Sequence, residues 1–290
     1  MQWLGRRESS NVEDRRGMSG GGKVLAGGGV LGIIIVIVNM LLGGNGDQGI
    51  QLPNLQEQTQ ATVLSPEEQA ADDKRAKFVK VVLADTEDVW GKIFSESSEQ
   101  YRAPTLVLFR DRVESACGNA SSASGPFYCP GDQKLYIDLS FYQELQNRFN
   151  APGDFAMAYV VAHEVGHHIQ KLLGTSEKMQ RLRGQVNEEE YNRYSVKLEL
   201  QADFYAGVWA NHAQQIKTAD GKSIIDVDDI NEALTAANAI GDDRLQKQSQ
   251  GYIVPESFTH GTSAQRMFWF KKGFETGDVS KGDTFNSPDL

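Results

Sequence analysis

The amino-acid sequence predicts a mainly helical α+β domain preceded by a single transmembrane helix. Most of the second half consists of long segments with helical apolar spacing and recognisable capping residues. A few short apolar runs rich in β-forming residues precede them and predict only a small sheet or hairpin. An uncharged apolar stretch, Val24–Leu42, lies near the start and has the length of a membrane span.

Composition limits the classes of function. The chain has 290 residues, of which 40% are hydrophobic, enough for one sizeable domain with appendages. The net charge is −10 and there is no long basic run, so nucleic acid is not an expected partner. The sequence gives no indication of the oligomeric state.

The first 23 residues are polar and become glycine-rich towards their end. They carry five Lys or Arg residues against three acids, and we expect a cytoplasmic tail with little fixed structure. Two interpretations of the arginines in this tail remain. The arginines bind phospholipid headgroups or a cytoplasmic partner, or the arginines act only as a topology signal.

Residues Val24–Leu42 predict an uncleaved membrane anchor. As a helix they would extend about 28 Å, close to the ~30 Å hydrocarbon core. A cleaved signal peptide would have a shorter apolar region and an A-x-A-like site, and none precedes Gly43. Because basic residues precede the span, we expect a single-pass membrane protein. Its N-terminus would be cytoplasmic and its folded domain extracytoplasmic.

Beyond the span we expect a flexible linker over residues 43–64, a folded domain over 65–275 and a disordered tail over 276–290. Ser65 and Glu68 predict a capping box that starts a helix reaching about Phe94. The other expected elements are a strand at 105–109, strand-like segments at 127–129 and 135–138, helices at about 140–149 and 226–239, and a mobile segment at 242–250.

The two cysteines, Cys117 and Cys129, are too few for a disulfide scaffold and are not spaced as a zinc site. Cys117 falls in a Ser/Ala/Gly-rich segment that we expect to be a loop. An extracytoplasmic domain lies in an oxidising compartment, which permits a bond between the two cysteines. Two unpaired thiols are the alternative.

The most informative stretch is H-E-x-x-H, in a helix expected from about Asp154, as N-cap, to Leu173. His163 and His167 are four residues apart, so both imidazoles lie on one face and can reach one zinc ion. Glu164 lies about 100° further around the helix, where it can take a proton from a zinc-bound water.

The motif also occurs by chance on surface helices. Here the helix is mostly apolar, and burying two histidines and a glutamate in it is costly unless something pairs them. We therefore predict one Zn²⁺ per chain. His168 faces away from the ion and is expected to be only a hydrogen-bonded neighbour.

Two histidines leave zinc one protein ligand short. Gln170 and Leu173 occupy the positions where the extended H-E-x-x-H-x-x-G-x-x-H motif has glycine and histidine, so that class is excluded. A second helix, Asn187–His212, offers Glu199 as third ligand and Asp203, one turn later, as acceptor for a ligand histidine. The alternative is that Glu199 and Asp203 are two acids on a solvent-exposed helix face with no role in metal binding.

These motifs carry a family resemblance that covers nearly the whole chain. The opening W-x-G-R-R-E-S-x-N-V-E-D-R-R at Trp3–Arg16, the segment Phe127–Pro130 and the H-E-V-G-H-H core resemble the bacterial neutral zinc metallopeptidases of the YpfJ type. The resemblance implies a zincin-like peptidase that is anchored in the bacterial inner membrane and whose third ligand is a glutamate.

The resemblance also implies roles beyond the ligands. In glutamate-liganded zinc peptidases a late histidine, with an arginine just downstream, commonly sits over the metal, and His260 and Arg266 resemble that pair. His260 would hold the oxyanion, and Arg266 would orient substrate or support the site. A strand beside the metal pairs with extended substrate in such enzymes. We expect Leu135–Asp138 in that role, or else as a cover of the core.

The sequence thus predicts a zinc metalloendopeptidase acting on peptides or proteins. His163, His167 and Glu199 would bind zinc, and Glu164 would be the general base. One alternative is a zinc-stabilised binding or adaptor module, which would need no general base and would tend to have four protein ligands. Another is an amidase acting on a non-peptide bond, with the same zinc chemistry. Regulation and cleavage preference cannot be read from the sequence.

Overall fold

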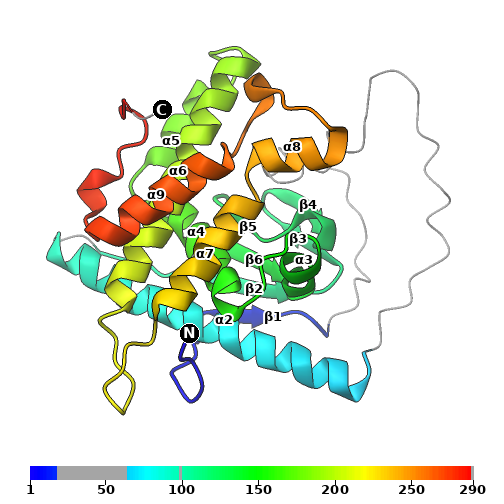
Figure 1. Ribbon diagram of the computed structural model, residues 1–290, viewed down its shortest axis with the longest axis vertical. Helices are drawn as coiled ribbons and strands as arrows, with labels where there is room; N and C mark the ends of the chain where they lie inside the picture. Colours follow the sequence, from blue (N-terminus) through cyan, green and yellow to red (C-terminus); the bar gives the residue numbers. More distant parts are fainter. Residues whose placement is uncertain (18–63, 98–99, 289–290) are drawn as a thin grey trace.

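The computed structural model describes residues 1–17, 64–97 and 100–288 (Figure 1). Its centre is a group of packed helices. These are α4 (Asp154–Leu172), α6 (Glu188–Ala213), α7 (Val227–Ala239) and α9 (Ser263–Thr276). The long helix α2 (Pro66–Glu96) runs along one side and packs on α4 and α6. The prediction of a mainly helical fold with a small sheet is confirmed.

The main sheet has four strands in the order β1 (Val12–Asp14), β2 (Thr105–Phe109), β6 (Lys134–Asp138) and β5 (Phe127–Cys129). β1 and β6 both run parallel to β2, and β5 runs antiparallel to β6. β5 therefore forms one edge of this sheet and β1 the other.

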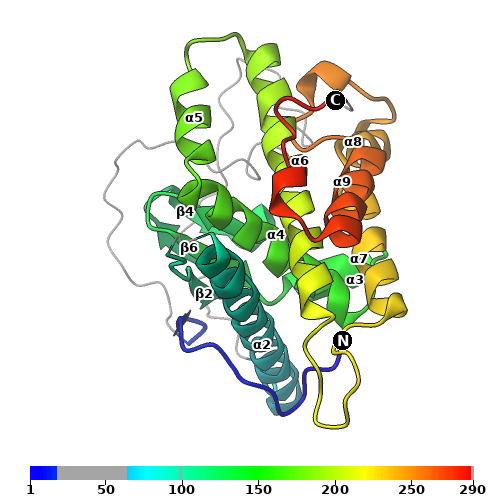
Figure 2. The same cartoon turned by 90° about the vertical axis from the view of Figure 1, so that its left-hand side faces the viewer.

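The remaining elements surround this framework (Figure 2). A second sheet pairs β3 (Arg112–Ser115) with β4 (Gly118–Ser121). The other helices are α3 (Phe141–Asn147), α5 (Thr175–Leu182) and α8 (Asp242–Gln250), with 3-10 turns η1 (Ser122–Ser124), η2 (Pro255–Ser257) and η3 (Val279–Lys281).

Two helix starts show how local sequence sets the ends of the elements. Ser65 and Glu68 form the expected capping box at the start of α2, with Pro66 as its first residue. In α4 the N-cap position belongs to Gly153, and Asp154 is the first helical residue. The predicted N-cap at Asp154 was therefore one residue too late.

Helices α6 and α9 approach each other closely where both carry glycine. A Cβ atom on Gly207 would lie 2.0 Å from the carbonyl oxygen of Phe270, and one on Gly273 would lie 2.0 Å from that of Phe204. Only glycine allows this separation. The contact fixes the position of α9, which supplies Arg266 to the site described below.

The structure differs from the prediction at the N-terminus. Residues 1–17 are packed on the domain, with Trp3 buried and Val12–Asp14 forming β1. The physical reason is charge pairing. The arginines that suggested a free tail meet acids of α2, as Arg6 does with Asp85. The predictions for residues 18–63, including the span Val24–Leu42 and most of the linker, lie outside the described residues.

No helix within residues 1–17, 64–97 and 100–288 combines the length and apolar character that a membrane crossing requires.

Two further segments expected to be mobile or disordered are ordered. Residues 242–250 form α8, and Asp242 at its start is buried. Residues 276–288 pack along α6, where Thr284 is fully buried and donates a hydrogen bond to the carbonyl oxygen of Lys197 at 2.6 Å. The polar composition of these residues predicts disorder. In the structure, side chains of α6 donate to backbone carbonyl groups of the tail, and a side chain of the tail donates to a backbone carbonyl group of α6.

The predicted disulfide between Cys117 and Cys129 is confirmed. The segment that holds Cys117 is the turn of the β3–β4 hairpin rather than an irregular loop. The bond therefore joins this hairpin to the edge strand β5.

Candidate metal centre

The centre lies where α4 crosses α6. A Cβ atom on Gly166 would lie 2.9 Å from the carbonyl oxygen of Ala202, so glycine is needed for the two helices to come this close. Gly166 stands between His163 and His167 on α4. Ala202 stands between Glu199 and Asp203 on α6. The close approach therefore brings the two pairs of polar residues together.

Three potential ligands meet at this crossing. His163 Nε2 lies 3.1 Å from Glu199 Oε2, and His167 Nε2 lies 3.5 Å from Glu199 Oε1. A tetrahedral zinc ion with bonds of roughly 2.0–2.1 Å would separate its ligand atoms by about 3.4 Å. The two histidine–glutamate separations are close to this value, and the donor atoms of all three residues lie within 4.8 Å of one another. His163 and Glu199 are buried and His167 is half-buried, so one side of the site remains accessible.

The far nitrogen of each histidine is held by a second side chain. His163 Nδ1 donates to Asp203 Oδ1 at 2.8 Å, as the sequence predicted, and His167 Nδ1 donates to Gln170 Oε1 at 2.9 Å. The Nε2 atoms are thereby left free of their protons to face the centre. Gln170 is itself fixed, because its amide donates to the carbonyl oxygen of Leu198 at 2.6 Å.

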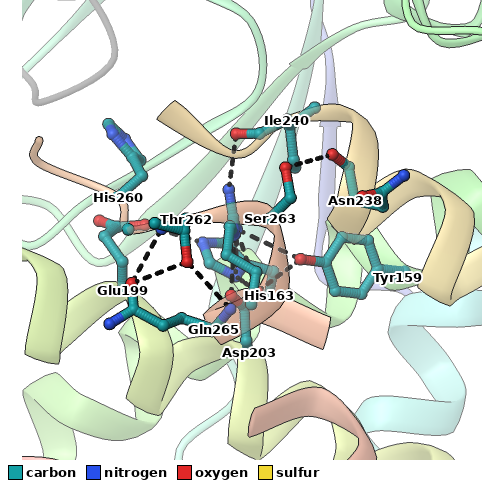
Figure 3. Close-up of polar contacts among 12 residues, drawn as sticks. Tyr159, His163, Glu199, Asp203, Asn238, Ile240, His260, Thr262, Ser263 and Gln265 are labelled. Atoms are coloured by element: carbon teal, nitrogen blue, oxygen red, sulfur yellow. Dashed lines mark hydrogen bonds and ion pairs between the residues drawn. The ribbon is translucent and has the colours of Figure 1, made fainter. Parts of the chain in front are cut away.

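Asp203 is the hub of a buried polar cluster (Figure 3). Arg266 donates to it from Nε at 2.8 Å and from Nη2 at 3.0 Å, and the hydroxyl of Tyr159 donates to the same carboxylate. Burial alone would raise the pKa of Asp203, but the charges of Arg266 and His163 lower it to about 2. Asp203 is therefore ionised whenever the domain is folded near neutral pH.

The electrostatics favour a cation at the centre. Burial disfavours the charged imidazolium of His163, yet the nearby carboxylates of Asp203 and Glu199 raise its pKa to about 10. Burial also opposes ionisation of Glu199, but the neighbouring His167 and His260 hold its pKa well below the usual value. A bound divalent cation would satisfy these buried negative charges.

Glu164 is buried beside the donor set and does not belong to it. Burial raises its pKa, and the nearby His167 and His163 oppose the increase. A backbone hydrogen bond from Tyr128, on the edge strand β5, also acts on this carboxylate. A carboxyl group with a raised pKa keeps its proton to a higher pH than an ordinary glutamate does.

His260 lies on the same side of the cluster as Glu199 (Figure 3). Its backbone N–H donates to Asp242 Oδ2 at 2.7 Å, and its Nδ1 lies 2.8 Å from the hydroxyl of Thr259. Asp242 also accepts from the backbone N–H groups of Thr259 and Gly261. The turn that carries His260 is thus anchored to the start of α8.

Comparison with known proteins agrees with this site. Residues 1–285 match the family model described as "Putative neutral zinc metallopeptidase". The chain belongs to this family. It is 48% identical to the uncharacterised protein YpfJ of Escherichia coli K12, over 98% of this chain and 99% of that protein.

An uncharacterised protein of Mycobacterium tuberculosis H37Rv is 42% identical over 74% of this chain and 73% of its own length. No solved structure gives a significant match. The family description supports a zinc peptidase, and the relatives' names add no substrate.

The structure of this zinc metallopeptidase family member corrects the position of the predicted substrate strand. Leu135–Asp138 belongs to β6, which is hydrogen-bonded to β2 on one side and β5 on the other. Its backbone groups are therefore already engaged. Of the two edge strands, β5 is the one in contact with α4, and no other strand of the described residues pairs with its outer side.

Arg266 also differs from one of its expected roles. Its side chain is buried behind Asp203 and bonded to it, so it supports the site rather than meeting substrate. His168 bonds the hydroxyl of Tyr128 at 3.0 Å and the carbonyl oxygen of Arg102 at 2.6 Å, as expected for a neighbour that is not a ligand.

Three supporting residues were not found from the sequence. In the sequence, Gln170 stands out only as a departure from the glycine of the extended motif. Its position three residues after His167 nevertheless puts its side chain within reach of that imidazole. Tyr159, one turn before His163, is within reach of the same cluster by its helical spacing. The sequence gives no local indication of the role of Asp242, because the backbone N–H groups that donate to it belong to residues 17 to 19 positions later.

Proposed function

We propose that this protein is a membrane-attached zinc endopeptidase in which Glu164 is the general base. The observation that carries the proposal is the convergence of His163, His167 and Glu199 on one point beside a buried carboxylate that is not one of the ligands. A purely structural zinc site would tend to have four protein ligands and would need no such group.

The three donors would hold the ion through His163 Nε2, His167 Nε2 and Glu199. When bound, zinc lowers the pKa of water and polarises the carbonyl of a peptide bond. Glu164 accepts the proton of the attacking water and later donates it to the departing amine. Asp203 and Gln170 keep the two imidazoles oriented throughout.

His260 is the candidate for stabilising the oxyanion. Its Nδ1 side is occupied by Thr259 and Asp242, which leaves Nε2 as the atom that can donate to substrate. A fixed donor of this kind stabilises charge that develops on a carbonyl oxygen. Its position beside Glu199 supports this role.

The edge strand β5 is the candidate for binding the substrate backbone. An extended peptide pairing along the outer side of β5 would run past Glu164, because the backbone of Tyr128 in this strand contacts that carboxylate. The disulfide at Cys129 holds the same strand in place. Main-chain pairing of this kind suits a broad range of peptide sequences.

For location, we propose that Val24–Leu42 attaches the protein to the bacterial cell membrane and that the domain is extracytoplasmic. The apolar character of this stretch supports attachment. The disulfide between Cys117 and Cys129 supports an oxidising compartment.

The test uses the full chain loaded with zinc and its Glu164→Gln variant, each incubated with a mixed library of unfolded peptides. Mass spectrometry identifies the products. We expect cuts from the wild type and a loss of at least about 100-fold in the variant. Glu164 is not a ligand, so both proteins should retain one zinc per chain.

Equal cutting by both proteins would overturn the role of Glu164. No cutting by either, with zinc confirmed in both, would favour the binding module. With that outcome, the alternative of an amidase would be tested by incubating the zinc-loaded protein with non-peptide amides.

A further inference from the structure

The N-terminal segment, Met1–Gly17, is part of the folded domain. Its strand β1 pairs in parallel with β2, with Val12 opposite Leu106 and Asp14 opposite Leu108. Backbone hydrogen bonds extend this pairing on both sides, from Leu106 N to Asn11 O at 2.9 Å and from Arg15 N to Leu108 O at 2.7 Å. The segment completes the main sheet at one edge.

The basic residues of the N-terminal segment are used inside the fold. Arg6 forms two hydrogen bonds with the buried Asp85 of α2, at 2.5 and 2.6 Å. Arg16 pairs with the buried Asp72, and Arg7 pairs with Glu87 and Asp88 of the same helix. These arginines therefore have a structural purpose, and they need not signal a cytoplasmic location.

The N-terminal segment also reaches the helix that carries the zinc ligands. The indole of Trp3 donates to Asp154, the first residue of α4, at 3.2 Å, and its ring packs edge-on against Phe78 of α2. Gln2 donates its backbone N–H to the carbonyl oxygen of Ile224 at 2.8 Å, just before α7. The segment thus touches three of the domain's long helices or their ends.

These contacts restrict how the chain can meet a membrane. β1 and β2 are hydrogen-bonded neighbours, whereas the hydrocarbon core of a bilayer is about 30 Å thick. If residues 18–63 crossed a membrane once, β1 would lie on one side and the rest of the sheet on the other. A single crossing and the observed sheet are incompatible.

We propose that the N-terminal segment and the domain lie on the same side of the membrane. This arrangement replaces a cytoplasmic N-terminus joined to an extracytoplasmic domain by one crossing. It follows from β1 and its ion pairs, and it does not depend on the peptidase activity.

The test compares two exposed positions in the full chain. Leu4 of the N-terminal segment and Val227 of the domain are 77% and 76% exposed, so cysteine at either should leave the fold intact. The protein without an added cysteine, whose two native cysteines are bonded to each other in the structure, gives the background labelling. Leu4→Cys and Val227→Cys are expressed separately in bacteria. Spheroplasts are then treated with a membrane-impermeant maleimide, with detergent-permeabilised samples as the full-labelling reference.

We expect the same labelled fraction, within about a factor of two, at both positions. Strong labelling of both before permeabilisation supports the proposal with the domain outside. Labelling of both only after permeabilisation also supports it, but overturns the extracytoplasmic location proposed above. Labelling that differs tenfold or more between the two positions before permeabilisation would overturn the same-side arrangement.

Discussion

Arg266 holds the carboxylate of Asp203 through two hydrogen bonds, from Nε to Oδ2 at 2.8 Å and from Nη2 to Oδ1 at 3.0 Å. Both side chains are buried, and Oδ1 also accepts from the ligand histidine His163. Arg266 therefore influences His163 through Asp203.

Replacing Arg266 by methionine should make the protein more sensitive to acid. The folded-state pKa of Asp203, about 2, lies below its ordinary value of 3.8. Its ionised form therefore adds stability that is complete above pH 3.8 and is lost as the pH falls towards 2. Without Arg266 that pKa rises, so acid unfolding of the metal-free protein, followed by circular dichroism, should shift to higher pH.

The matched control is Arg266→Lys, which keeps the charge but loses the two-point contact. It should unfold at a pH between those of the wild type and Arg266→Met. The free energy of unfolding at neutral pH should fall by about 3–5 kcal/mol in Arg266→Met, because a buried charge loses its partner. An unchanged acid midpoint in Arg266→Met would show that Asp203 does not depend on this ion pair.

Gly166→Ala should damage the zinc centre without altering a ligand. The added methyl group would lie 2.9 Å from the carbonyl oxygen of Ala202 and 3.0 Å from its Cα, both backbone atoms that cannot rotate away. The helices must separate, which moves Glu199 away from the histidines. We expect a fall in zinc affinity of at least about tenfold, measured by competition with a chromogenic chelator.

Gly91→Ala provides the control for this change. Gly91 lies within the C-terminal part of α2, and a Cβ atom there would meet nothing within 4 Å. The substitution should raise the free energy of unfolding by about 0.5–1 kcal/mol, because alanine is the better helix former, and should leave zinc affinity unchanged. Equal behaviour of the two alanine variants would contradict the importance of the close helix crossing.

The parts of the site that lie within one helix could be predicted from the sequence. The spacing of His163, Glu164 and His167 is local, and so is the four-residue step from Glu199 to Asp203. What joins the two helices is tertiary packing, and the sequence offers no periodic signal for it. The three-residue strand β1 is the clearest case. Val-Glu-Asp has no alternating pattern, and it becomes a strand only because β2 is beside it.

Gln170→Leu should weaken zinc binding by removing the group that orients His167. The leucine side chain has similar volume but cannot accept the hydrogen bond from Nδ1. Loss of such a partner typically costs about 10–100-fold in metal affinity. Gln170→Glu keeps the acceptor for His167 but loses the amide donor to Leu198, so its affinity should lie between those of the wild type and the leucine variant in the same chelator competition. If the leucine variant bound zinc as tightly as the glutamate variant, the orienting role of Gln170 would be ruled out.

Trp3→Ala should destabilise the whole domain, because the N-terminal segment is packed on α2 and α4. Trp3 is only 8% exposed, packs on Phe78 with ring centroids 5.5 Å apart and bonds Asp154. Removing a buried tryptophan costs about 3–5 kcal/mol, whereas Leu4→Ala, at a position that is 77% exposed, should change stability by no more than about 0.5 kcal/mol. Urea unfolding of the zinc-loaded proteins measures both. A free N-terminal tail would give the same small effect for the two variants, and a packed segment requires the large difference.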